Sequence, residues 1–378
     1  MAVTKSMRGG RLVAALVLTA GGLASGSVPA TAQATAQWAW ATVRNGTGDS
    51  LVSVATDAGS VSGGGAGVHR VGTGHYQVTF YGAQKNGSIT SVAVASPIGT
   101  TARTCATGTW MRSTDSEVVE VFCQTLDGVA MDSGFVVHWL AAQGTGGVLG
   151  YGWNGSPTDN CGGPGESYSS VGGSNQTCPV NGNAETRFGS LGVDGGVAIV
   201  GAKDQIAFQA GSFPTSCSLV SLTTVLNPHN VGNPSDDTTD KFADVRCWET
   251  NDTNNIYHEH VVVFMKGLGL KGTVRKTVAY LVARRPTAAS YHPAQLDRYT
   301  SSGGAITVKR LGTGHYAVTL DRMPKGGGAQ VTVLDGSERR VCTIAGITTR
   351  AVPPTIRVSC FDGAGVATDT RFVLAYTR

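Results

Sequence analysis

Three histidines in the middle of the chain have the side-chain type and spacing of a divalent-metal site. His258 and His260 flank Glu259 at the expected start of a strand. Because side chains alternate along a strand, both imidazoles would lie on one face, where a metal ion could reach both. His229 or Asp236 could supply a third ligand. The sequence thus predicts a candidate metal site at His258, His260 and His229, with an ordinary surface strand end as the alternative.

The stretch from Asn233 to Asn255 is rich in side-chain oxygens, which it draws from several asparagines and from Asp236, Asp237, Asp240, Asp244 and Asp252. Such hard ligands suit Ca²⁺. Their spacing does not match the EF-hand loop, however, so a solvated polar loop is the simpler interpretation. We therefore expect no cofactor, and Ca²⁺ or another divalent metal is the alternative.

Two tryptophans are candidates for contacting a sugar. The chain has six tryptophans and few aromatic residues in all, and we expect most of them to pack in the core. Trp153 and Trp248 lie in the middle of the chain near Asn, Asp and Thr residues. An exposed indole in such surroundings offers an apolar platform with polar groups beside it for hydroxyls.

One segment has part of the pattern of a catalytic nucleophile. Asp132-Ser133-Gly134 resembles the nucleophile segment of chymotrypsin-like proteases, but not all of the glycines that surround the serine in those proteases are present. A turn before a strand is the simpler interpretation. An extracellular hydrolase or lyase directed at polysaccharide is the enzyme alternative. It would use residues of the middle region, namely His229, His258, Glu259, His260, Asp236 and Asp237.

These candidate residues belong to a sequence that contains three internal repeats. Residues 67–80 align with residues 307–320, and the pentapeptide Gly-Thr-Gly-His-Tyr at 72–76 recurs unchanged at 312–316. A degenerate copy lies between them, with Phe188 in place of the tyrosine. The predicted β repeats cover residues 38–141, 148–267 and 278–378. The middle one carries insertions, and insertions on a repeat scaffold usually form the loops that bind ligands.

The cysteines follow the repeat. One pair recurs in each copy, which predicts the disulfides Cys105–Cys123, Cys217–Cys247 and Cys342–Cys360. The remaining Cys161 and Cys178 would then close an insertion of the middle repeat. Zinc is the competing interpretation, but no C-x-x-C spacing is present.

The hydrophobic pattern predicts an all-β protein of about eight short strands per repeat. Tyr76, Val78 and Phe80 alternate with polar residues, and Gly, Asn, Asp or Pro separate the apolar runs. Two architectures fit this pattern. A six-bladed β-propeller with two blades per repeat is slightly favoured, and three tandem β-sandwiches pinned by disulfides are the alternative.

The N-terminus has the features of a secretory signal peptide over residues 1–32. Lys5, Arg8 and Arg11 precede a short apolar run, and small-residue cleavage sites end at Ala32 or Ala36. Without residues 1–32, Lys and Arg number 26 against 25 Asp and Glu, so no basic field indicates a nucleic-acid partner. No later apolar run is long enough for a membrane span. We expect a secreted, extracellular protein with no membrane span.

The motifs of the repeats resemble those of a group of exported bacterial proteins. The stretch Pro286–Tyr291, the Gly-Thr-Gly-His-Tyr-x-Val-Thr motif and the stretch Val358–Gly365 resemble repeats in exported, uncharacterised β-rich proteins of high-GC soil bacteria of the actinomycete kind. The resemblance covers all three repeats and is weakest in the middle one. It implies a compartment and a repeat register but no activity.

The function predicted first is therefore that of a non-catalytic binding or surface-interaction protein with a glycan or cell-envelope ligand. It rests on the repetition, the low charge and the lack of a clear acid–base or nucleophile set. A structural matrix or coat protein is a third alternative. Oligomeric state is left open.

Overall fold

The computed structural model confirms the all-β prediction. It describes residues 37–52, 57–60, 62–83, 90–113, 115–141, 147–154, 166–173, 175–180, 183–203, 216–227, 238–248, 259–268, 277–336, 338–348 and 353–378. All of them belong to one unit, Thr35–Arg378. The predicted signal peptide over residues 1–32 lies outside the described residues. Where the chain is described, its helical structure is the short 3₁₀ turn η2 (Gln295–Asp297), and no helix there is long and apolar enough to cross a membrane.

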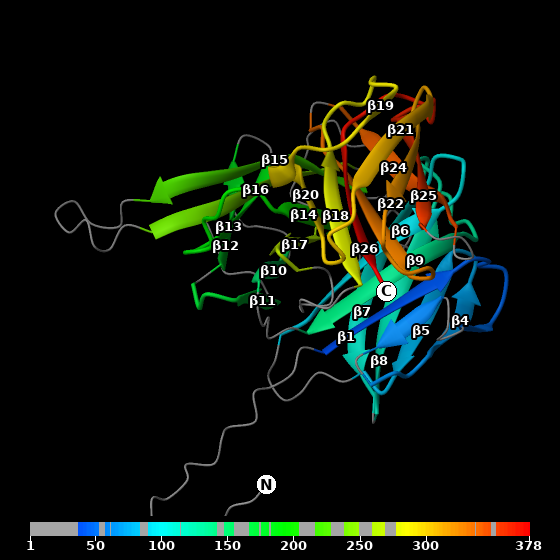
Figure 1. Cartoon of the computed structure of the whole chain (residues 1–378). Helices are drawn as coiled ribbons and strands as arrows, with labels where there is room; N and C mark the ends of the chain where they lie inside the picture. Colours follow the sequence, from blue (N-terminus) through cyan, green and yellow to red (C-terminus); the bar gives the residue numbers. More distant parts are fainter. Residues whose placement is uncertain are drawn as a thin grey trace, which may run out of the picture. The chain divides into compact units, whose positions relative to one another are not determined.

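Figure 1 shows the strands of the three repeats. The described strands follow a similar order in each repeat, with one strand fewer in the middle one. The first repeat contributes β1 (Gln37–Val43), β2 (Ser50–Val52), β3 (Ala58–Ser60), β4 (Ala66–Gly72), β5 (His75–Tyr81), β6 (Val92–Ile98), β7 (Thr104–Arg112), β8 (Ser116–Gln124) and β9 (Gly134–Ala141). The middle repeat contributes β10 (Val148–Asn154), β11 (Glu166–Ser169), β12 (Asn175–Val180), β13 (Asn183–Phe188), β14 (Val197–Ala202), β15 (Ser216–Asn227), β16 (Thr238–Trp248) and β17 (His260–Lys266). The third contributes β18 (Val278–Ala283), β19 (Ser290–Tyr291), β20 (Arg298–Thr300), β21 (Ile306–Gly312), β22 (His315–Leu320), β23 (Gly328–Val333), β24 (Arg340–Ile347), β25 (Thr355–Asp362) and β26 (Phe372–Thr377).

Each repeat folds its strands into two antiparallel sets. We call them the inner and the outer sheet of the repeat. The inner sheets have the orders β3-β1-β9-β6, β11-β10-β17-β14 and β20-β18-β26-β23. The outer sheets have the orders β2-β4-β5-β8-β7, β12-β13-β16-β15 and β19-β21-β22-β25-β24. A parallel pair between Ile344 of β24 and Ile98 of β6 joins two of these sets into one nine-stranded sheet.

The two kinds of sheet differ in how they are buried. In the outer-sheet strands β5, β13 and β22, buried and half-buried side chains alternate, which is the pattern of a sheet with one solvated face. Strands β9, β14, β18 and β26 of the inner sheets are buried at every position. The inner sheets must therefore be covered on both faces.

One face of each inner sheet packs on the outer sheet of its own repeat. In the first repeat, Ala41 of β1 and Trp139 of β9 share a core with Tyr76 of β5 and Val121 of β8. The third repeat has a core of the same kind, with Leu281 and Leu374 against Val318 and Val358. Each repeat is thus a pair of sheets packed face to face.

The second faces of the inner sheets pack on one another. Strands β6, β14 and β23, one from each repeat, are in mutual contact. Their contact is specified by hydroxyl groups: Ser96 Oγ accepts the N–H of Val331 at 3.0 Å, and Thr332 Oγ1 accepts the N–H of Val200 at 2.9 Å. One large apolar cluster accordingly includes residues of all three repeats, among them Trp40, Phe264 and Tyr280.

The contacts between repeats form a cycle. Bridges join Thr107 of the first repeat to Lys203 of the second, Leu219 of the second to Leu334 of the third, and Ile344 of the third to Ile98 of the first. The favoured six-bladed propeller is not shown by this structure, in which none of the sheets closes. Its paired sheets share cores as sandwiches do, and the three pairs meet at β6, β14 and β23 instead of following one another in a row.

The disulfides lie where the repeat predicted them. Cys105–Cys123, Cys217–Cys247 and Cys342–Cys360 are formed, and each joins directly opposed residues of neighbouring outer-sheet strands. Cys178 is also disulfide-bonded, and its predicted partner, Cys161, lies outside the described residues. On the chain-entropy model, closing an 18-residue separation contributes about 3 kcal/mol to stability.

The repeated Gly-Thr-Gly-His-Tyr motif builds a polar network around one carboxylate. In the first repeat, Arg70 donates from Nε and Nη2 to the two oxygens of Asp132, at 2.9 and 2.8 Å. The Gly74 N–H and the Tyr76 hydroxyl donate to the same carboxylate at 3.0 and 3.1 Å. The Tyr76 hydroxyl in turn accepts the N–H of Ser133 at 3.1 Å. The network ties the β4–β5 hairpin to the segment that precedes β9.

The third repeat has the same network. Arg310 and the Gly314 N–H donate to Asp369, with Arg310 Nη2 at 2.8 Å and the glycine nitrogen at 2.9 Å. Tyr316 donates to Asp369 at 3.0 Å and accepts the N–H of Thr370 at 3.2 Å. Gly314, like Gly74, has φ +70°, a conformation that favours glycine. The motif is therefore structural, and Asp132 belongs to it.

The middle repeat departs from this network and extends a hairpin. Asp240 is fully buried and accepts from Arg187 Nε and from the Ser190 N–H, each at 2.7 Å. The prediction of a polar loop from Asn233 to Asn255 is wrong for residues Thr238–Trp248, which form the strand β16. The insertion between Cys217 and Cys247 lengthens the β15–β16 hairpin, whose arms extend side by side beyond their neighbours in Figure 1. Pairing on both sides of β16 outweighs the weak strand preference of its aspartates.

We predict that Asp132→Asn and Asp369→Asn each lower the free energy of unfolding by about 2–3 kcal/mol at neutral pH, because each removes charge-assisted hydrogen bonds from partly buried donors. Urea unfolding measures the change. Asp49→Asn is the control: because its pair with His69 is exposed, its loss should lower the free energy of unfolding much less than either of the other two substitutions.

The same variants predict a pH dependence. The side-chain hydrogen bonds from Arg70 hold the pKa of Asp132 below its ordinary value. The stabilisation is therefore present above the ordinary aspartate pKa and is lost as the pH falls through the lowered one. The difference in the free energy of unfolding between the wild type and Asp132→Asn should become smaller in acid. A difference that stays constant from neutral pH into acid would contradict this origin.

Candidate functional site

An open groove of about 340 Å³ lies on the outer sheet of the first repeat. It is bordered by polar side chains and one aromatic ring, and it is lined by Asp49, Ser50, Gly67, Val68, His69, Thr79 and Tyr81. Strand pairing positions these residues: Gly67 of β4 is opposite Thr79 of β5, and β2 pairs with β4 on the other side. We call this site the Tyr81 groove.

Tyr81 is the aromatic wall of the groove. Tyr81 is 45% exposed, and it is the one aromatic residue among the exposed large hydrophobic residues that the structure describes. The ring lies against Gly67, where an added Cβ would be only 2.5 Å from the Tyr81 hydroxyl. The glycine therefore leaves the space that the ring occupies, and substitution at Gly67 would displace the ring.

Asp49 and His69 form a hydrogen-bonded pair among the residues that line the groove. Asp49 accepts the N–H of Arg70 at 2.8 Å and lies 3.1 Å from His69 Nδ1. The backbone hydrogen bond from Arg70 and the side-chain bond with His69 keep the pKa of Asp49 below its ordinary value. The carboxylate and the imidazole are both exposed, so both are accessible to a ligand.

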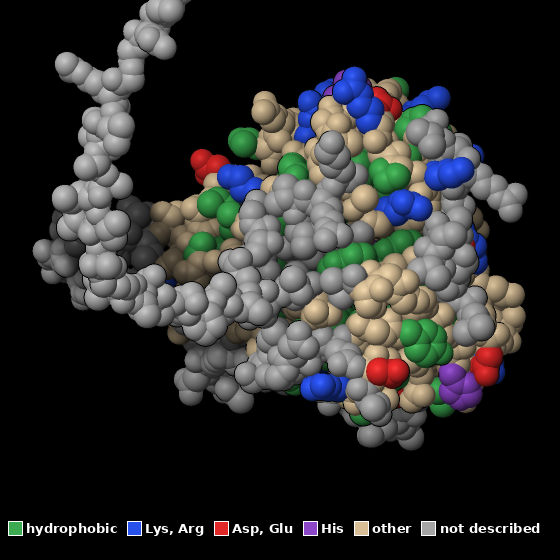
Figure 2. All heavy atoms as spheres, turned by 60° about the horizontal axis from the view of Figure 1, so that its bottom comes forward, with side chains coloured by type: hydrophobic (Ala, Val, Ile, Leu, Met, Phe, Trp, Pro, Cys, Tyr) green, Lys and Arg blue, Asp and Glu red, His purple; other side chains and the backbone are tan. Residues whose placement is uncertain are grey.

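The third repeat lacks the residues that make the Tyr81 groove, and sequence reasoning missed the groove. At the aligned positions the third repeat has Thr307 for Gly67 and Asp321 for Tyr81. There the N–H of Arg310 is bonded to the carbonyl of Ala289 instead of to a carboxylate. The difference between two otherwise similar copies was the available signal. Figure 2 shows one face of the molecule, on which acidic and histidine side chains lie beside hydrophobic ones.

The predicted sugar platform at Trp153 lies at the contact between the first two repeats. Trp153 is half-buried, and Lys203 Nζ lies 3.8 Å from the centre of its ring. Trp110 of the first repeat meets the same indole edge to face, with ring centres 6.4 Å apart. Lys203 is 4% exposed and pairs with Glu259 at 3.1 Å. In this arrangement Trp153 packs between repeats.

The predicted platform at Trp248 is half-buried at the end of β16. The guanidinium of Arg246 lies 5.4 Å from its ring centre. Arg246 also donates to Asn183 Oδ1 and to the carbonyl of Gly336, each at 2.7 Å. Trp248 and Trp153 belong to different sheets, and the structure shows no contact between them among the residues it describes.

The predicted metal site is described only in part. His258, His229, Asp236 and Asp237 lie outside the described residues. His260 begins β17, is fully buried and pairs in register with Asn154 and Ala202. Within the described part of the chain, no three His, Cys, Asp or Glu side chains are grouped as metal ligands. The metal site therefore stays a prediction.

A pair of carboxylates that sequence reasoning did not find lies on the extended hairpin. Glu185 faces Asp244 across β13 and β16. Burial, followed by the charge of Asp244 and a hydrogen bond to it, raises the pKa of Glu185. Glycosidases hold their two carboxyl groups about 5 to 9.5 Å apart. A hydrogen-bonded pair is closer than that and leaves no room for substrate.

The candidate nucleophile Ser133 has no catalytic partner among the described residues. It is 3% exposed, and its hydroxyl donates to the carbonyl of Gly134 at 2.7 Å. The nearby His75 pairs with Glu120 instead, at 3.3 Å. Glu259, the acid of the enzyme alternative, pairs with Lys203 as described above.

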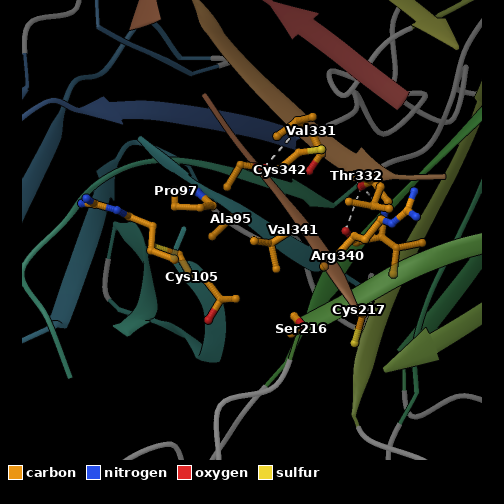
Figure 3. Close-up of a pocket in the computed structure, with 17 residues that line it drawn as sticks. Ala95, Pro97, Cys105, Ser216, Cys217, Val331, Thr332, Arg340, Val341 and Cys342 are labelled. Atoms are coloured by element: carbon orange, nitrogen blue, oxygen red, sulfur yellow. Dashed lines mark hydrogen bonds between the residues drawn. The ribbon is translucent and has the colours of Figure 1, made fainter. Parts of the chain in front are cut away.

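The junction of the three repeats encloses a second, smaller cavity (Figure 3). Residues of all three repeats line it, including Cys105, Cys217 and Cys342. Its volume is about 50 Å³, enough for one or two waters and too small for a sugar or a drug-sized ligand. The Tyr81 groove is therefore the better candidate.

Comparison with known proteins adds no assignment: no protein-family model, curated protein or solved structure matches this chain.

We predict that Trp153→Ala acts on stability. Removing an indole packed between two repeats should lower the free energy of unfolding by about 3 kcal/mol, as measured by urea unfolding. Leu296→Ala is the matched control, because Leu296 is 64% exposed and its loss should change stability by less than about 0.5 kcal/mol. If Trp153→Ala were as stable as the wild type, the packing role would be wrong.

Proposed function

We propose that this protein is a secreted, non-catalytic binding protein that holds a glycan of the cell envelope or its surroundings in the Tyr81 groove. The observation that carries the proposal is an exposed tyrosine ring beside an open, polar-lined groove of about 340 Å³. The disulfides agree with an oxidising, extracellular compartment.

The chemistry of the groove suits a sugar. A pyranose has an apolar face that packs on an aromatic ring and a rim of hydroxyls that need partners. Tyr81 offers the ring, whereas Ser50, Thr79, His69 and Asp49 offer hydroxyl, imidazole and carboxylate groups. Asp49 is ionised at neutral pH, and its lowered pKa keeps it ionised into mild acid. An ionised carboxylate accepts hydrogen bonds from sugar hydroxyls.

The groove also favours binding over catalysis. Hydrolysis of a glycosidic bond uses two carboxyl groups on opposite sides of the bond, and Asp49 is the one carboxylate among the described residues that line this groove. The ligand would rest on a sheet whose disulfide and hydrogen-bond network hold it rigid, which favours affinity because little ordering is needed on binding.

We predict that Tyr81→Ala weakens binding by about tenfold or more, since one aromatic–ligand stack contributes about 1 kcal/mol or more in addition to the buried area. Pull-down on chitin, cellulose and peptidoglycan, followed by titration with soluble fragments of whichever is bound, measures the loss. Gly67→Thr, which installs the residue of the third repeat, should displace the ring and weaken binding as well.

Met111→Ala is the matched control for these variants. Met111 is 51% exposed on β7 of the same outer sheet and does not line the groove. Its loss should leave binding unchanged. If the wild type bound none of the three polymers, or if Tyr81→Ala bound as tightly as the wild type, the proposed function would fail.

A further inference from the structure

The contacts between successive repeats have equivalent residues at equivalent places. Lys203 bridges to Thr107, and Leu334 bridges to Leu219, each two residues after the first cysteine of the preceding repeat. The N–H of Lys203 donates to the carbonyl of Glu259 at 3.0 Å, and the N–H of Leu334 donates to that of Arg371 at 2.9 Å. Lys203 thus corresponds to Leu334, and Glu259 corresponds to Arg371.

Strand register identifies two more equivalent pairs. Trp110 is opposite Val119, and Leu222 is opposite Ala243, each four residues before the second cysteine of its repeat. Trp153 is opposite Val261, and Val282 is opposite Val373. Val261 follows Glu259 by two residues, just as Val373 follows Arg371 by two. Trp110 therefore corresponds to Leu222, and Trp153 corresponds to Val282.

At the contact between the first and second repeats, the side chains of Trp110, Trp153, Lys203 and Glu259 fill the space between these equivalent positions. The indoles of Trp110 and Trp153 meet edge to face, and Lys203 Nζ lies 3.8 Å from the centre of the second ring. The ammonium group is neutralised by Glu259 at 3.1 Å. Two rings and a cation–carboxylate pair thus occupy the space.

At the contact between the second and third repeats the same place is open. Leu222, Val282 and Leu334 stand where the first contact has two tryptophans and a lysine, and they line a cavity of about 200 Å³. Arg371 lines it at the position of Glu259. Among the described residues, no acidic side chain pairs with Arg371. A second arginine at the cavity, Arg284, is already paired with Asp297 at 2.9 Å.

We propose that this cavity binds a small aromatic carboxylate. The ligand ring would take the space that an indole fills in the equivalent contact, and its carboxylate would pair with Arg371. The protein would then supply the positive charge at the position where the first contact has the negative charge of Glu259. An apolar cavity of about 150 Å³ is enough to bind benzene, so the volume here admits one ring with a short acidic side chain. A guanidinium group binds a carboxylate through two parallel hydrogen bonds.

Calorimetric titration of the folded, disulfide-bonded protein with phenylacetate tests the proposal. We expect saturable binding and a thermal midpoint that rises with ligand concentration. Phenylacetamide, the neutral analogue, should bind at least about tenfold more weakly, and Arg371→Gln should weaken phenylacetate binding by about tenfold or more, because each loses a charge-assisted pair. Arg284→Gln, whose side chain already has an acidic partner, should have a smaller effect.

Leu222→Trp installs the residue of the filled contact and should abolish binding. Leu222 is half-buried, so the variant should still fold, which unfolding in urea would verify. No saturable binding of phenylacetate by the wild type would overturn the proposal, as would equal binding by Leu222→Trp or Arg371→Gln. Tyr81→Ala should bind phenylacetate like the wild type, so that this site and the Tyr81 groove succeed or fail separately.

Discussion

The apolar second face of the inner sheets is the constraint on which the rest of this structure depends. A sandwich usually has its outward faces in water, but strands β9, β14, β18 and β26 are buried at every position. A repeat on its own would expose a contiguous apolar sheet, so three repeats must meet and cover one another. The hydroxyls of Ser96 and Thr332, together with the Gln330 amide that donates to the Val94 carbonyl, then add directional hydrogen bonds to the non-directional apolar contact between these strands.

The outer sheets are free of that constraint, and local devices hold them. A disulfide joins directly opposed strands in each repeat, and an arginine–aspartate–tyrosine network fastens the β4–β5 and β21–β22 hairpins to the inner sheet. The Tyr76 hydroxyl is protonated at neutral pH and donates to the carboxylate. Burial raises its pKa to about 12, which keeps it protonated in alkaline solution as well. With the scaffold fastened in this way, the solvated faces can change without loss of the fold.

Differences between equivalent positions are where the three copies acquire different properties. Gly67 and Tyr81 make a groove where the third repeat has Thr307 and Asp321. Two tryptophans fill one contact between repeats, whereas Leu222 and Val282 leave the next one open. The middle repeat lengthens a hairpin and loses the tyrosine network. In a repeated fold, chemistry specific to one copy is found by comparing copies position by position.

The amino-acid sequence alone determined the all-β class, the threefold repeat and three of the disulfides, because alternation, internal similarity and a cysteine pair once per copy are local signals. It could not decide how the sheets are arranged, since a propeller and sandwiches use similar short strands. The pairing of the strands into several small sheets and the contact of β6, β14 and β23 are seen only in the tertiary structure. The Tyr81 groove depends on a ring that folds over a glycine on a neighbouring strand, and the open contact depends on residues from two repeats. Such sites join side chains far apart in the chain, so they exist only once the tertiary fold has brought those side chains together.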